Sequence, residues 1–160
     1  MSPRSLMPLL LLAACTARPQ PGLVPLQGPG PVALSGWTLQ ASAAAGAALI
    51  KTGQDGREEL RIACRRDPAD FWVLAGALTP IGSEERLSLG AGDEVVALVA
   101  RPELRAQGVE ASGPVPAALL ARLETGATVG VSYGAQTLRT TGPDPALAAR
   151  FAAACRSGGR

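Results

Sequence analysis

Short runs of apolar or alternating residues, each ended by turn residues, make up most of the chain after position 35. The runs are GWTLQAS (36–42), GAALIKT (46–52), EELRIAC (58–64), DFWVLAGAL (70–78), ERLSLG (85–90), EVVALVAR (94–101), ATVGVSYG (127–134) and QTLRTT (136–141). Runs of this length at this spacing are typical of antiparallel sheets. The pattern predicts a mainly β fold, an antiparallel sandwich or barrel-like domain.

Two of the connections carry explicit hairpin signals. The segments GQDGRE (53–58) and GAGDE (90–94) supply glycine and aspartate where a tight turn needs positive φ angles. We therefore expect the strands on either side of each segment to pair with one another.

One internal segment breaks the strand pattern. Residues 114–126, PVPAALLARLETG, begin with prolines, end on glycine and place Leu119, Leu120 and Leu123 at helical spacing. Proline is favoured in the first turn of a helix and glycine just after its end. The segment predicts one short internal helix.

A second helix is predicted near the end of the chain. Residues 144–159 begin with Asp144, a good N-cap, followed by Pro145 in the first turn, and finish on two glycines. The apolar residues recur at steps of four, at Leu147, Phe151 and Cys155. This spacing gives the helix one buried face.

Two cysteines of the domain fall on predicted core faces. Cys64 shares an inward strand face with Leu60 and Ile62, and Cys155 lies on the apolar face of the second helix. Two buried cysteines that meet in an oxidising compartment pair with one another, so we expect a Cys64–Cys155 disulfide. The alternative is two separate buried thiols.

Phe71 and Trp72 are neighbours in a predicted strand. Adjacent strand residues point to opposite faces, so both rings are buried only when both faces of that strand are covered. The alternative is that one ring belongs to an exposed interaction surface, and we take this pair as the candidate interaction surface of the domain.

The first residues resemble a secretory leader. Residues 1–14 carry one positive charge at Arg4, then an apolar segment too short to span a membrane. The four residues LAAC, 12–15, resemble the lipobox of bacterial lipoproteins, whose cysteine is acylated after the leader is removed. The resemblance implies lipid attachment at Cys15, where two or three acyl chains give stable membrane binding. The alternative is an ordinary leader cleaved near Ala14 or Ala17.

The resemblance also implies a location and a domain organisation. In Gram-negative lipoproteins the residue after the cysteine influences sorting, and Thr16 is not the aspartate that favours inner-membrane retention. We expect an outer-membrane lipoprotein facing the periplasm. Residues 15–31, rich in proline and glycine, form a linker from the lipid to a globular domain of residues 32–160.

Composition narrows the possible chemistry. The chain has no histidine, which excludes Ser-His-Asp, Cys-His and His-ligated zinc sites. Its 15 basic and 13 acidic residues are scattered, so the sequence shows no nucleic-acid-binding surface. Only 3% of the residues are aromatic, and the core must therefore be mainly aliphatic. We expect no metal and no cofactor.

Other candidate motifs are weak. The acidic pairs Asp67/Asp70, Glu84/Glu85 and Asp93/Glu94 fall in predicted turns, where solvated acids are common. The segment GAGDEV lacks the third glycine of a dinucleotide fingerprint. Tyr133 follows a serine at a strand end, and we interpret it as a packing residue rather than a catalytic one.

Four segments of the domain are similar to small proteobacterial envelope proteins of the invasion-associated locus B type. They are Gly36-Trp37, the strand ending in Cys64, LLARLETGATVGVSYGAQ (119–136) and FAAAC (151–155). The resemblance implies a β-sandwich and nothing about functional residues. A further cysteine that the family usually has near the early tryptophan is missing here.

These observations favour a lipid-anchored envelope protein without enzymatic activity. We expect it to bind another envelope protein as an accessory or assembly subunit. One alternative is a histidine-independent hydrolase that uses two carboxylates on cell-wall sugars. The other is a periplasmic inhibitor of a hydrolase, with the segment from Thr79 to Arg86 as its inhibitory loop.

Overall fold

A computed structural model describes residues 36–42, 46–66, 69–104 and 108–157. Internal contacts divide the chain into Met1–Pro31 and Val32–Arg160, and all described residues belong to the second unit. The predicted leader, the lipid attachment at Cys15 and the linker lie outside the described residues. Within these ranges, no helix has both the length and the apolar character needed to cross a membrane.

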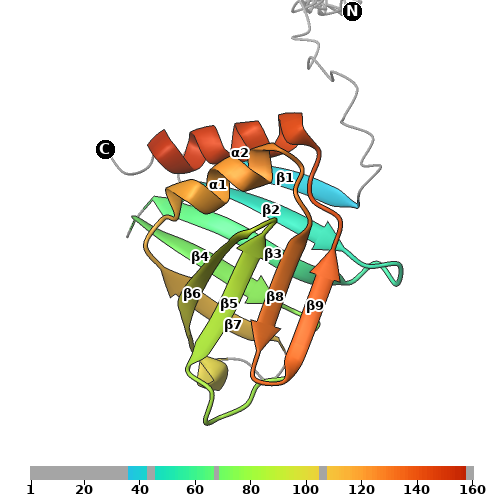
Figure 1. Cartoon of the computed structure of the whole chain (residues 1–160), viewed down its shortest axis with the longest axis vertical. Coiled ribbons are helices and arrows are strands. Elements are labelled where there is room, and N and C mark those ends of the chain that lie inside the picture. The colour runs from blue at the N-terminus through green and yellow to red at the C-terminus, as the bar shows by residue number, and fades with distance from the viewer. Residues whose placement is uncertain (1–35, 43–45, 67–68, 105–107, 158–160) are drawn as a thin grey trace, which may run out of the picture. The chain divides into compact units, whose positions relative to one another are not determined.

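Nine antiparallel strands form a single curled sheet that resembles half of a barrel (Figure 1). The strands are β1 (Trp37–Ser42), β2 (Gly46–Thr52), β3 (Glu58–Arg66), β4 (Ala69–Ala75), β5 (Arg86–Ala91), β6 (Glu94–Ala100), β7 (Val109–Gly113), β8 (Val129–Tyr133) and β9 (Gln136–Thr140). Their order across the sheet is β1-β2-β3-β4-β7-β6-β5-β8-β9. The predicted barrel-like, mainly β fold is confirmed.

The predicted turns and helices are also confirmed. The β2–β3 and β5–β6 hairpins turn at Gly56 and Gly92, whose φ angles are +77° and +60°. The helices are α1 (Ala117–Glu124) and α2 (Pro145–Ser157), and a 3₁₀ turn η1 (Pro102–Leu104) precedes β7. The Asp144 carboxylate accepts the N–H groups of Ala146 and Leu147, as an N-cap should.

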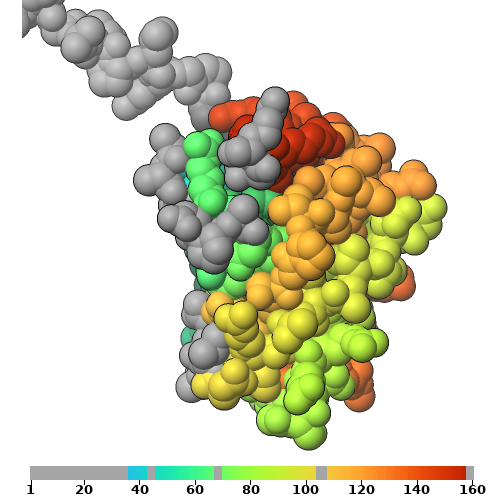
Figure 2. Space-filling model, turned by 90° about the vertical axis from the view of Figure 1, so that its left-hand side faces the viewer, coloured from blue at the N-terminus to red at the C-terminus, as the bar shows by residue number. Residues whose placement is uncertain are grey.

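The inner face of the sheet and the two helices enclose the main core, which is mostly aliphatic with four aromatic rings among its members. Alternate residues of each strand point inward, and the helices lie together over one end of the curled sheet (Figures 1 and 2). α2 contacts β1, β2 and β3, whereas α1 contacts β5 and β6. The fully buried helix residues include Leu119, Leu120, Ala148, Phe151 and Ala152. The helices therefore close this end of the core.

Cys64 and Cys155 join β3 to α2. Their Cα atoms lie 5.3 Å apart, within the range that a disulfide requires, and the structure bonds the two sulfurs. Both residues face the main core. The predicted pair is thus confirmed, and it fastens the last described helix to the third strand.

An ion pair connects the two helices at the surface. Both terminal nitrogens of Arg156 in α2 donate to the carboxylate of Glu124 at the end of α1, at 2.8 and 3.1 Å. These hydrogen bonds, and then the negative charge, raise the pKa of Arg156. An exposed pair contributes little to stability, so its main effect is to orient the helix ends.

The rings of Phe71 and Trp72 are buried on opposite faces of β4. Phe71 is fully buried in the main core, and Trp72 is 8% exposed on the outer face. There Trp72 packs in a second cluster with Ala48, Ile50 and Ala63, while the Arg65 guanidinium lies 4.8 Å from its ring centre. Neither ring is exposed, so the structure agrees with the interpretation in which both faces of this strand are covered, and not with the alternative in which one ring belongs to an exposed interaction surface.

Candidate functional site

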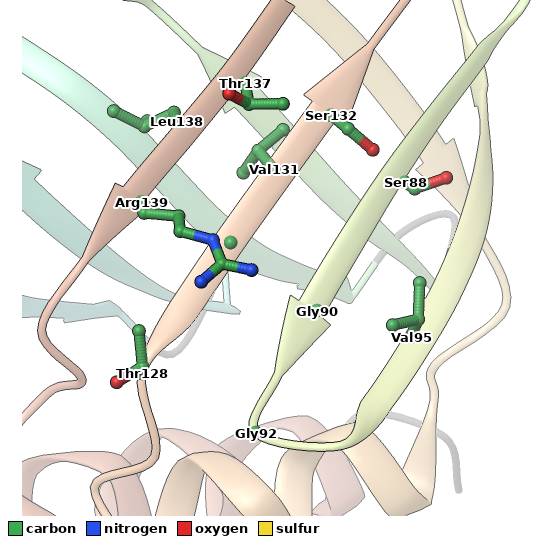
Figure 3. Close-up of a pocket in the computed structure, with 11 residues that line it drawn as sticks. Ser88, Gly90, Gly92, Val95, Thr128, Val131, Ser132, Thr137, Leu138 and Arg139 are labelled. Atoms are coloured by element: carbon green, nitrogen blue, oxygen red, sulfur yellow. The ribbon is translucent and has the colours of Figure 1, made fainter.

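A hollow opens on the outer face of the sheet, over β5, β8 and β9 (Figure 3). The strand register places two rows of residues side by side across four strands. The first row is Val95, Gly90, Gly130 and Arg139, and the second is Ala97, Ser88, Ser132 and Thr137. The two glycines of the first row give the hollow a floor without side chains, and Ser88, Ser132 and Thr137 of the second row give it an edge of hydroxyl groups.

The floor of the hollow is formed by Gly90 and Gly130, and the backbone conformation of neither residue requires glycine. Neither Gly90 nor Gly130 has a positive φ angle. A Cβ at Gly130 would meet no atom closer than 3.9 Å, which is an ordinary contact, and one at Gly90 would lie 3.3 Å from the Glu94 carbonyl oxygen. Position 130 would therefore accept a side chain, and its absence is what keeps the hollow open.

Arg139 supplies the charge of the site. Its side chain extends from β9 across β8 towards Gly90 (Figure 3). Within the described part of the chain, the Arg139 side chain makes no hydrogen bond and no ion pair. A guanidinium presents several N–H donors in one plane, a geometry that matches a carboxylate or a phosphate.

The remaining lining is neutral. The hydroxyls of Ser88, Ser132, Thr137 and Thr128 line the hollow, and each can donate or accept a hydrogen bond. At the opposite edge Val95 is 65% exposed, and Val99 on the same face of β6 is 63% exposed. The site thus combines one cation, a row of hydroxyls and an apolar border.

The volume of the hollow limits its ligand. It encloses about 270 Å³ and is open to solvent. Pockets for drug-sized molecules begin at about 300 Å³ and enclose most of the ligand. A single anionic side chain or small acid matches this space better than a nucleotide or an oligosaccharide does.

Tyr133, interpreted above as a packing residue, fixes the connection between β4 and β5. Its buried hydroxyl accepts the Ile81 N–H at 3.1 Å and lies 2.7 and 3.0 Å from the carbonyl oxygens of Ile81 and Glu84. Beside it, the Gln136 amide pairs with both backbone groups of Thr79, at 2.8 Å each. The segment from Thr79 to Arg86 is therefore held against the ends of β8 and β9.

Two residues of the acidic pairs, Asp93 and Glu84, serve local structure. The Asp93 carboxylate bonds the Arg122 guanidinium at 2.9 Å, which connects the β5–β6 hairpin to α1. Glu84 accepts the backbone N–H of Arg86 at 3.1 Å. Asp70 lies on the outer face of β4, and Asp67 lies outside the described residues. The described ranges contain no group of three or more acidic or cysteine residues that could hold a metal ion.

Comparison with known proteins assigns no relative. No protein-family model, curated protein or solved structure matches the chain. The hollow was not anticipated from the sequence, where GAGDE was interpreted only as a hairpin. The available signal was a glycine inside each of two strand runs, at Gly90 and Gly130, because glycine in a strand marks a place of close approach.

Proposed function

We propose that the chain is a lipid-anchored envelope protein that binds another envelope protein and has no enzymatic activity of its own. The anchor is Cys15 of the LAAC segment, and residues 16–31 carry the domain away from the bilayer. An accessory or assembly subunit of this kind needs a stable domain and an accessible surface for its partner.

The observation that carries the proposal is the outer face of β6 beside the hollow. Val95 and Val99 expose about two thirds of their surface on one strand face. Val95 lies opposite Gly90, and Ala97, between the two valines on this face, lies opposite Ser88. Val99 lies between Arg86 of β5 and Ser112 of β7. A strand face with exposed apolar residues, and with one arginine beside Val99, is suited to contact with a second protein surface.

The test is crosslinking in living cells with the full-length, acylated protein, followed by mass spectrometry. We expect one recurrent envelope protein among the crosslinked products. The control is Cys15→Ser, which removes the acylated sulfur and should release the protein from the membrane and abolish the crosslink.

Two outcomes would contradict the proposal. If Cys15→Ser stays in the membrane fraction, the lipid anchor is not at this residue. If the acylated protein remains membrane-bound and captures no specific partner, the accessory-subunit function fails.

A second candidate function is inhibition of a hydrolase by the segment from Thr79 to Arg86. The observation in its favour is that Tyr133 and Gln136 hold this segment by four hydrogen bonds, one of them donated by the Tyr133 hydroxyl to the carbonyl oxygen of Ile81 or Glu84, with Gly82 and Ser83 exposed at its tip. A loop ordered before binding loses less entropy on contact with an enzyme. Lysozyme and protease assays test it, and unchanged activity of those enzymes with excess protein would exclude inhibition of them.

A further inference from the structure

We infer that the hollow over Gly90 and Gly130 is a binding site for a carboxylate, and that the carboxylate is an aspartate or glutamate side chain on the surface of the partner protein. The inference rests on the proposed function for the source of the carboxylate. The chemistry of the site itself rests on the described residues alone.

Charge complementarity identifies the ligand as an anion. Arg139 reaches over the glycine floor and has no counter-charge among the described residues (Figure 3). A carboxylate lying over Gly130 can receive two parallel N–H bonds from the guanidinium, the strongest arrangement for this pair. Ser88, Ser132 and Thr137 stand in the adjacent row, where their hydroxyls can donate to the same anion.

The border of the hollow identifies the source of the anion. Val95 lies in register with Gly90 and is 65% exposed. A sugar acid would place hydroxyl groups against this valine, whereas an acidic side chain in a protein surface brings apolar neighbours. Contact with Val95 therefore favours the protein side chain.

The glycines determine how deep the anion can lie. Because Gly130 has no side chain, a carboxylate can approach the backbone of β8 alongside the stem of Arg139. A valine at this position is compatible with an extended strand and would fill the floor. Substitution here can thus block the site while leaving the fold intact.

The experiment is an NMR titration of the oxidised full-length chain carrying Cys15→Ser. The probes are a capped Val-Glu-Val tripeptide, the Val-Gln-Val counterpart, and glucuronate. The readouts are the backbone amides of Gly90 and Gly130 and the Nε–H of Arg139. We expect the glutamate peptide to bind at least tenfold more tightly than the glutamine peptide, and more tightly than glucuronate.

Two variants and two matched controls locate the site. Arg139→Gln and Gly130→Val should each weaken binding of the glutamate peptide at least tenfold. Arg150→Gln, an exposed arginine on α2, and Gly82→Val, at an open position in the β4–β5 connection, should change it less than twofold. If Gly130→Val fails to fold, Gly130→Ala replaces it, with a smaller but measurable loss.

Each result decides one part of the inference. Equal binding of both peptides, or full binding by Arg139→Gln, would show that the hollow does not recognise a carboxylate. Tighter binding of glucuronate would overturn the protein side chain as the source. A photocrosslinker at Val95, compared with one at Arg150, separates this inference from the proposed function. A partner captured only from position 150 would leave the accessory function standing and remove the hollow from it.

Discussion

The indole N–H of Trp37 donates to the carbonyl oxygen of Thr141 at 2.8 Å, across 104 positions of sequence. Trp37 is the first residue of the edge strand β1, and Thr141 directly follows the other edge strand, β9. Because the sheet is open between β1 and β9, this bond connects the two edges at one point.

Replacing the two tryptophans by phenylalanine should separate the value of this bond from that of ring burial. The Trp72 N–H is buried and has no hydrogen-bond partner among the residues that the structure describes. Trp37→Phe removes an indole N–H that forms a hydrogen bond, whereas Trp72→Phe removes a buried indole N–H that forms none. We expect Trp37→Phe to lower the free energy of unfolding by about 1 kcal/mol more than Trp72→Phe. Urea denaturation of both variants measures the difference, and an equal loss would contradict it.

The Cys64–Cys155 bond should contribute much of the stability of the oxidised domain. It closes a loop with a sequence separation of 91, for which chain entropy gives about 4 to 5 kcal/mol. Reduction, or the double variant Cys64→Ala with Cys155→Ala, should lower the free energy of unfolding by about this amount. Urea denaturation with and without reductant measures it. Cys15→Ser is the control, and its domain should respond to reductant as the parent does.

Tyr133→Phe should loosen the connection between β4 and β5 while retaining the packing of the ring. The variant leaves the Ile81 N–H without its acceptor, at a cost of about 1 to 2 kcal/mol. Hydrogen exchange at Ile81 should become faster, while exchange at Ile62 in the core changes only with global stability. Unchanged exchange at Ile81 would mean that the segment is ordered without the tyrosine hydroxyl.

Two glycine-to-alanine changes should differ sharply in their effect. Gly46 has a φ of +98°, and a Cβ there would collide with the carbonyl oxygen of Cys64. Gly46→Ala should therefore cost at least about 2 kcal/mol of unfolding free energy. The Cβ of Gly130→Ala makes only ordinary contacts in a normal strand conformation, and we expect a change within about 0.5 kcal/mol of zero or a gain. Thermal unfolding of the pair tests the contrast.

The sequence pattern was sufficient to predict eight of the nine strands. Seven of these have inward apolar residues at alternate positions, and β9 has only Leu138 on its inward face. The strand that was not predicted is β7, whose sequence VEASG holds only Val109 and Ala111 on the buried face. Its strand conformation depends on pairing with β4 on one side and β6 on the other. A short strand that is stabilised by its neighbours leaves little signal in its own residues.

The site could not be predicted because it depends on the order of strands. Gly90 and Gly130 are 40 positions apart and become neighbours only because β5 pairs with β8. Arg139 faces them through the β8–β9 register. Local patterns determine which residues point outward, but they do not determine which outward residues share a row.

The position of β7 between β4 and β6 determines the order in which the sheet can be completed during folding. β1 to β4 pair with their sequence neighbours, so they can associate as soon as they are synthesised. The second neighbour of β4 is β7, which is synthesised only after β5 and β6. The second neighbour of β5 is β8, which is synthesised only after α1. Until then β4, which carries Phe71 and Val73, has an unpaired edge of the kind that recruits other chains. These late, non-local pairings should set the folding rate, and they mark the period in which aggregation competes with folding.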